Sequence, residues 1–146
     1  MSVVSSESGQ VEYTCVVTPS CNANTAKSAY TTTAVPIATV QLWRMEVRIP
    51  AGHQGLTGIA LIDSGVFVIP YSAGAMSWLT GDNDLLEYPY DKELGANVQL
   101  ATYNTDTVYN HGWQVRLIYT PMAAIDVSEG IIEVPASPDW LAGAGG

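Results

Sequence analysis

Two segments of this sequence alternate strictly between apolar and polar residues, and this alternation constrains the fold more than any other feature. In segment 40–49, "VQLWRMEVRI", every second residue from Trp43 to Ile49 is apolar and the residues between them are charged. Successive side chains of a β-strand point to opposite faces, so a period of two predicts a half-buried strand. Segment 113–120, "WQVRLIYT", repeats the pattern. The residues expected in the core are Trp43, Met45, Val47, Ile49, Val98, Leu100, Trp113, Val115 and Leu117.

Six shorter apolar segments also have the length and composition of strands. Each is flanked by residues that favour turns, mainly Gly, Pro, Asp, Asn and Ser. These segments are "VEYTCVVT" (11–18), "TGIALI" (57–62), "VFVIP" (66–70), "MSWLT" (76–80), "NVQLATY" (97–103) and "IIEV" (131–134). With the two long strands, the predicted number of strands is about eight.

Segment 82–94, "DNDLLEYPYDKEL", is the stretch with some helical character. Pro89 interrupts it and leaves at most a helical turn on either side. A parallel sheet needs helical crossovers between its strands, and none is predicted. The predicted fold is therefore all-β: an antiparallel β-sandwich of jelly-roll type, or a similar barrel. The predicted division is an extended N-terminal arm with one docking strand (1–39), a β-sandwich domain (40–135) and a short C-terminal tail (136–146).

The composition excludes several classes of partner. Five basic residues against fourteen acidic ones give a net charge of 5 − 14 = −9, and no Lys/Arg cluster offers a surface for nucleic acid. No apolar run approaches the roughly 20 residues that span a bilayer, and residues 1–10 lack the features of a secretion signal. We therefore expect no nucleic-acid and no membrane partner. Only 13% of the residues are charged, which suits contacts with other subunits.

The stretch "AGHQGLTGIALIDSG" (51–65) carries three glycines that could belong to a phosphate-binding loop. Such a loop needs its glycines between a strand and a helix, often with a lysine. Here Gly52, Gly55 and Gly58 are evenly spaced, and a strand-like segment follows them. The favoured interpretation is a tight connection after Pro50, with "DSG" turning the next strand back as a hairpin.

Candidate catalytic groups are few. His53 lies in this connection and His111 in "YNHGW", and either would need a nucleophile such as Ser64 or Cys15 beside it. No motif supplies that context. We expect both histidines to bond to loop backbone or to a neighbouring subunit, so the protein is predicted not to be an enzyme and to have no catalytic residues.

Metal and redox sites are equally weakly indicated. Asp82, Asp84 and Glu87 could supply oxygen ligands to calcium, but the pattern of a calcium loop is absent, and a polar turn with local side-chain caps is favoured. Cys15 and Cys21 could close a small disulfide loop, although two reduced, partly buried thiols are the favoured interpretation. No cofactor or metal is expected.

Aromatic residues outside the two long strands are the best candidates for a binding surface. Exposed tryptophans and tyrosines either anchor protein interfaces or stack on sugar rings, and the low charge favours the interface. Tyr103 is also in this group, because it falls near a predicted strand end. The residues proposed for an interface or for ligand stacking are Trp78, Tyr88, Tyr90, Tyr109 and Trp140.

Three stretches together resemble small structural proteins of tailed bacteriophages: "GLTGIALIDSG", "VIPYSAGAMSWLTGDND" and "LATYNTDTVYNHGWQVRLIY". The shared pattern is a Gly-rich turn and strand, a turn after Trp78, and then Tyr-Asn-Thr with a histidine before the last long strand. It covers roughly residues 40–120. The resemblance implies a β-sandwich virion component, on the head or on the tail, and transfers no functional residues.

The expected function is that of a non-enzymatic bacteriophage virion protein, a capsid decoration or cement protein that stabilises the shell through subunit contacts. The alternatives are a tail or baseplate component and a carbohydrate-binding adsorption module. Expected partners are the major capsid protein and further copies of the chain, with a glycan as the alternative ligand. The expected location is the virion, assembled in the reducing host cytoplasm, which suits unpaired cysteines.

Overall fold

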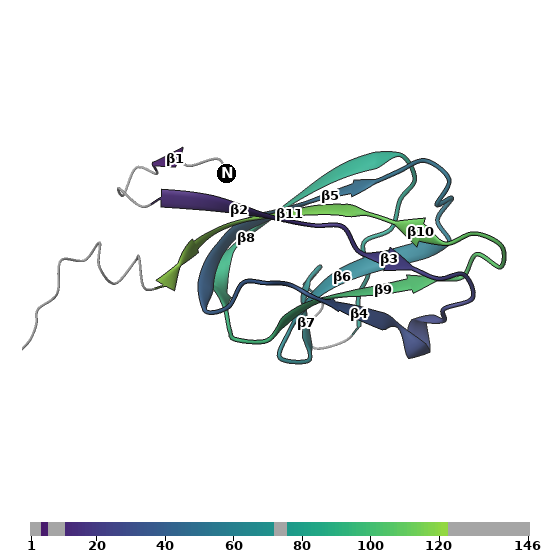
Figure 1. Cartoon of the computed structure of the whole chain (residues 1–146), viewed down its shortest axis with the longest axis horizontal. Helices are drawn as coiled ribbons and strands as arrows, with labels where there is room; N and C mark the ends of the chain where they lie inside the picture. Colours follow the sequence, from purple (N-terminus) through teal and green to yellow (C-terminus); the bar gives the residue numbers. More distant parts are fainter. Residues whose placement is uncertain (1–3, 6–10, 72–75, 123–146) are drawn as a thin grey trace, which may run out of the picture.

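The computed structural model describes residues 4–5, 11–71 and 76–122, which form two antiparallel sheets packed face to face (Figure 1). The first sheet has five strands in the order β1-β2-β11-β5-β8. Their bounds are Val4–Ser5 for β1, Val11–Val17 for β2, Gln114–Pro121 for β11, Val40–Ile49 for β5 and Asp84–Leu94 for β8. The two long strands predicted from alternation, β5 and β11, lie side by side in this sheet.

The second sheet has four strands in the order β4-β9-β6-β7. Their bounds are Thr31–Ala34 for β4, Val98–Asn104 for β9, Thr57–Asp63 for β6 and Val66–Ile69 for β7. A small ribbon of β3 (Ser20–Cys21) and β10 (His111–Gly112) and one 3-10 turn, η1 (Lys27–Ala29), complete the described elements.

The path of the chain between the sheets makes the fold a jelly roll. Leaving out the two-residue strands, the chain passes from β2 to β4, β5 and β6, so that it changes sheet at every step. It continues through β7 in the second sheet, and then β8, β9 and β11 alternate between the sheets again. This winding of eight strands into two four-stranded faces is that of a jelly roll. The predicted fold class, an antiparallel β-sandwich of jelly-roll type, is confirmed.

The core lies between the two sheets, and eight of the nine residues expected there are buried. Trp43 is the exception, because it is only half-buried. The pairing of β5 shifts by one residue at Trp43 against both neighbouring strands. A bulge of this kind reverses the alternation, so Leu42 and Met45 both point inward. The Trp43 indole instead donates a hydrogen bond to the Thr120 hydroxyl at 2.9 Å.

The helical character expected on either side of Pro89 is wrong, because residues Asp84–Leu94 of this segment form strand β8. This strand pairs with β5 on one side only and forms the edge of the first sheet. Pro89 has no backbone N–H, so a central strand position would leave a hydrogen bond unmade. An edge strand has one row of free backbone groups, and Pro89 is accommodated there without losing a partner.

Two other predicted strands have different outcomes. Segment 76–80 is not a strand, and only Leu79 makes an isolated bridge to Ile59. Segment 131–134 lies outside the described residues. Among the described residues there are still eight strands longer than two residues, because β4 and β8 were not predicted as strands and replace these two segments in the count. The predicted arm contributes β2 beside β11 and β4 beside β9, so it supplies strands to both sheets.

The glycine-rich stretch is a turn, as predicted. Gly52 and Gly55 have positive φ angles of 108° and 74°, which glycine adopts without strain. The carboxylate of Asp82 accepts the backbone N–H groups of Gly52 at 2.8 Å and Gln54 at 3.1 Å. Asp82 therefore serves as a cap that fixes the β5–β6 connection.

Candidate interaction surfaces

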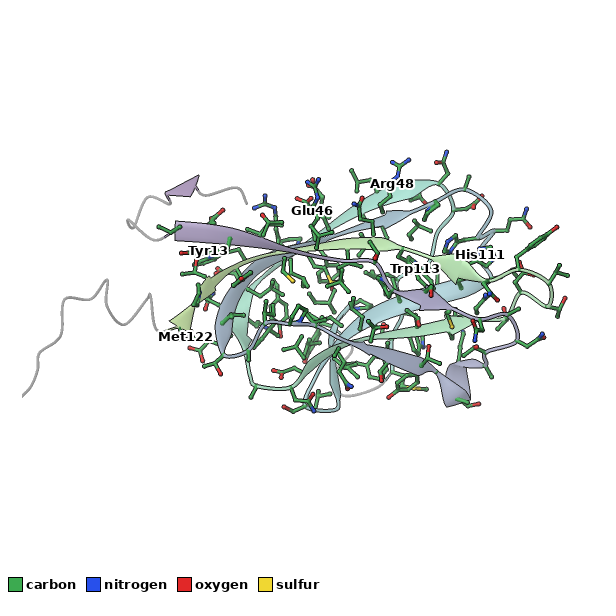
Figure 2. The ribbon with its side chains drawn as sticks, in the orientation of Figure 1. Tyr13, Glu46, Arg48, His111, Trp113 and Met122 are labelled. Carbon is green, nitrogen blue, oxygen red and sulfur yellow. The ribbon has the colours of Figure 1, made fainter. Side chains whose placement is uncertain are left out.

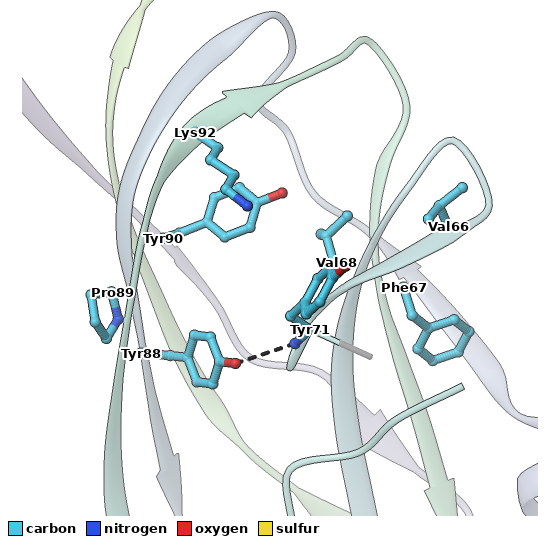
Figure 3. A pocket seen from close by; sticks show the side chains of 8 residues that line it. All are labelled: Val66, Phe67, Val68, Tyr71, Tyr88, Pro89, Tyr90 and Lys92. Atoms are coloured by element: carbon cyan, nitrogen blue, oxygen red, sulfur yellow. Dashed lines mark hydrogen bonds between the residues drawn. The ribbon is translucent and has the colours of Figure 1, made fainter. Parts of the chain in front are cut away.

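A groove opens along one side of the sandwich, between the edge strands β7 and β8 (Figure 3). Its volume is about 610 Å³. Tyr88 and Tyr90 point into it from β8, while Tyr71, which follows β7, faces them. We call this the tyrosine groove; its lining residues are Val66, Phe67, Val68, Tyr71, Tyr88, Pro89, Tyr90 and Lys92.

The polar groups of the tyrosine groove are arranged around its aromatic rings. The Tyr88 hydroxyl accepts the backbone N–H of Tyr71 at 3.2 Å, which ties β8 to the end of β7 (Figure 3). The Lys92 ammonium lies 5.7 Å from the Tyr71 ring centre and 5.8 Å from that of Tyr90. Burial, and secondarily the charge of Asp63, raise the pKa of Tyr90. The groove therefore offers aromatic faces with a single cation between them.

The second candidate surface is the loop 105–110 between β9 and β10, which we call the anchor loop. It presents two large apolar side chains to solvent: Val108 is 68% exposed and Tyr109 is 67% exposed. Hydrogen bonds hold the loop from inside. The Asp106 carboxylate accepts the backbone N–H of Val108 at 2.9 Å and of Tyr109 at 3.3 Å. The buried Asn104 amide donates to the Tyr109 carbonyl at 2.9 Å.

The base of the anchor loop contains both histidines. Figure 2 labels His111 and, close to it, Trp113. Both lie at the end of the sandwich opposite Tyr13 and Met122. The His111 Nε2–H donates to the Asp106 carboxylate at 2.8 Å. The His53 ring packs against the His111 ring, with the ring centres 4.5 Å apart and the planes tilted by 42°. The sequence had no local signal for this pairing, because 58 positions separate the two histidines (111 − 53 = 58).

His53 has both ring nitrogens engaged within the fold. Its Nε2 lies 3.0 Å from the Gly112 carbonyl, which can only accept, so Nε2 carries the proton. Its Nδ1 therefore accepts the hydroxyl proton of Thr57 at 2.7 Å in the neutral ring. Burial, and then the neighbouring His111, lower the pKa of His53. This agrees with the expected bond to loop backbone and leaves the neutral ring no lone pair for proton abstraction.

The other residues considered for chemistry are separate from the histidines. Ser64 lies in the β6–β7 turn, where its hydroxyl contacts Asp63. Cys21 is a buried residue of β3, and its thiol lies 3.6 Å from the Thr31 hydroxyl. Cys15 and Cys21 are both free, as favoured by the sequence, and burial raises the pKa of the Cys15 thiol.

The acidic turn provides local caps. The Asp84 carboxylate accepts the N–H of Asp82 at 2.9 Å, while Glu87 points outward from β8. Within residues 4–5, 11–71 and 76–122, no three His, Cys, Asp or Glu side chains gather in a way that could hold a metal ion. In the same residues, no helix has the length and hydropathy needed to cross a membrane.

The aromatic candidates predicted from the sequence occupy different places. Tyr88 and Tyr90 belong to the tyrosine groove and Tyr109 to the anchor loop. Trp78 instead packs against the outer face of the second sheet, where Tyr30, Phe67 and Tyr103 contact it at ring-centre distances of 5.5, 5.2 and 4.9 Å. Trp140 lies outside the described residues. Tyr71 and Val108 were missed, because each lies in a turn with no periodic pattern around it.

Comparisons with known proteins find likenesses among solved structures. No family model matches the sequence, and neither does any curated protein. Among solved structures, the chain is similar to one from the cyanophage Pam1 capsid asymmetric unit, with a TM-score of 0.45 and 12% identity. The match covers 75% of this chain and 84% of that chain. The jelly-roll assignment rests on the strand order and draws nothing from this likeness.

Proposed function

We propose that the protein is a non-enzymatic structural component of a bacteriophage particle, a decoration or cement subunit that binds the shell and stabilises it. The observation that carries this proposal is the anchor loop, a firmly held loop that exposes an adjacent valine and tyrosine. The motif behind the bacteriophage resemblance includes Asn104 and His111, two of the residues that hold this loop. The resemblance and the anchor loop thus rest on the same part of the chain.

A rigid apolar tip suits protein binding for an energetic reason. Ordering a flexible loop on binding costs conformational entropy, and a loop already ordered in the free protein avoids most of that cost. Tyrosine is also among the residues that dominate binding energy at the centre of interfaces. With only 13% of the chain charged, few ions need to be desolvated when such a surface is covered.

The partner in this proposal is the major capsid protein, with self-association of the subunit as a further contact. A net charge of −9 keeps the free subunit soluble and disfavours the packaged genome as a competitor. The absence of an enzymatic role is part of the proposal: both ring nitrogens of His53 are engaged within the fold, and the Thr57 hydroxyl that it contacts is only 1% exposed, out of reach of a substrate.

The test is co-sedimentation of the purified protein with isolated phage heads. We expect the double variant Val108→Ser/Tyr109→Ser to bind at least about tenfold more weakly, since loss of one or two anchor residues removes more than 1.4 kcal/mol. Val16→Ser is the matched control, because Val16 is similarly exposed but lies on β2. Equal binding by the anchor-loop variant and the wild type would contradict the proposal.

Cryo-EM of the particle distinguishes the head from the tail. Density for this subunit on the shell supports the decoration role, whereas density confined to the tail or baseplate favours the alternative location. The carbohydrate-binding alternative would use the tyrosine groove, since aromatic faces stack on sugar rings. A glycan array with saturable binding that is lost in Tyr71→Ala, together with no binding to heads, would replace our proposal with that alternative.

A further inference from the structure

The tyrosine groove has the chemistry of a site for an extended proline-rich peptide. Aromatic-lined grooves recognise P-x-x-P segments, which already hold the polyproline II conformation and lose little entropy on binding. Tyr71 is 71% exposed, so its ring is accessible at the rim. Tyr88 and Tyr90, on either side of Pro89 in β8, form the aromatic wall of the groove (Figure 3).

The chain itself contains a segment of this kind. Residues 133–140 read "EVPASPDW", with Pro135 and Pro138 in P-x-x-P spacing. We infer that this segment of the C-terminal tail binds in the tyrosine groove of the same chain, with a carboxylate beside Lys92. The inference does not depend on the proposed role in a phage particle.

Charge complementarity supports this occupant. Among the residues that the structure describes, Lys92 is the only cation that lines the groove. The chain has five basic residues. The 24 residues that follow Met122 (146 − 122 = 24) include four acidic residues and no lysine or arginine. Two of these acids, Glu133 and Asp139, flank the P-x-x-P segment on either side. Whichever direction the segment runs along the groove, it therefore brings one of these carboxylates toward Lys92.

The point where the chain leaves the sandwich favours binding within one chain. The Met122 N–H donates to the Thr39 carbonyl at 3.1 Å, and the Thr39 N–H donates to the Gly95 carbonyl at 2.8 Å. Gly95 directly follows β8, so the tail starts near the Lys92 end of the groove. Residues 123–134 then separate Met122 from Pro135, and an extended chain of that length spans up to about 40 Å. A short tether also raises the effective concentration of the segment to the order of millimolar.

The experiment uses the full chain and compares it with Pro135→Ala/Pro138→Ala by ¹⁵N–¹H NMR. In the wild type, we expect the Tyr71 and Lys92 amide signals and the Trp140 indole signal to differ from those of the variant. Ser137→Ala is the matched control, because it alters the same segment without removing a proline. Unchanged groove signals in the proline variant would overturn the inference.

A synthetic peptide of residues 131–142 supplies an independent measurement. We expect the peptide to shift the groove signals of the proline variant, and to need a concentration at least about tenfold higher with the wild type, whose own tail competes. Equal titrations, or no binding to either protein, would contradict the inference. Lys92→Glu should weaken tail binding, and adding Glu133→Lys/Asp139→Lys should restore it.

Sedimentation velocity distinguishes one chain from two. We expect the wild-type groove signals to be independent of concentration while the protein sediments as a monomer. Groove signals that appear only when the protein dimerises would show that the segment is exchanged between copies, and would overturn binding within one chain.

Discussion

At the scale of single residues, His53 shows how a polar side chain can be buried without becoming a reactive one. It is 1% exposed, yet both ring nitrogens have partners, so burial leaves no unmade hydrogen bond. The same arrangement disfavours the protonated ring. A second proton on Nδ1 would make this nitrogen a donor, so the Thr57 hydroxyl would have to rotate in order to accept from it. The His111 ring, centred 4.5 Å away, also disfavours the charged form of His53.

The pH dependence of stability follows from the lowered pKa of His53. Because this pKa is lower in the folded protein than in the unfolded chain, the unfolded chain binds more protons below about pH 6.5. The free energy of unfolding should therefore be level above about pH 7.5 and should decrease as the pH falls from there toward 5. Chemical denaturation across this range measures the effect. NMR titration of the His53 ring with a midpoint at or above 6.5 would contradict it.

At the scale of elements, the anchor loop depends on one carboxylate more than on its own apolar residues. The pKa of Asp106 is lowered by the N–H of Val108 first and by His111 next. A carboxylate with a lowered folded-state pKa stabilises the fold above its unfolded pKa of about 3.9 and loses this effect as the pH falls through the folded value. The loop should thus be firm at neutral pH and loosen only in strong acid.

Replacing Asp106 tests that dependence. In Asp106→Ala, the backbone N–H groups of Val108 and Tyr109 lose their acceptor, and His111 loses its partner. We expect amide hydrogen exchange at these two residues to become much faster, and binding to phage heads to weaken although both anchor side chains remain. Asp91→Ala, on β8, is the control. Unchanged exchange rates in Asp106→Ala would show that other contacts hold the loop.

At the scale of the whole molecule, stability depends on the layer between the two sheets. Leu117 is fully buried in that layer, while its neighbour Arg116 is exposed on the outer face. Leu117→Asp should lower the free energy of unfolding by several kcal/mol, about 3 or more, because it buries an unpaired charge. Arg116→Asp should change it by less than about 1 kcal/mol. Similar losses in urea denaturation of the two variants would contradict the assigned faces of β11.

The predictions from sequence succeeded for features that neighbouring residues determine. They failed for features that depend on which strands pair with each other. Tyr88 and Tyr90 were identified as candidate surface aromatics, but their groove also needs Tyr71 from the segment that follows β7. Pro89 was interpreted as a break between helical turns, because a sequence does not reveal that one side of its strand is free of partners. The interface roles of these tyrosines stay predictions.

The sequence by itself determined the fold class, because a period of two and the glycine and aspartate turns act over a few residues at a time. It therefore predicted β5, β11 and most of the buried face. Only the tertiary structure decided the reversed alternation at Trp43, the edge position of β8 and the packing of His53 against His111. Each of these depends on which distant strands become neighbours and in what register, and that choice is made by packing the two sheets together.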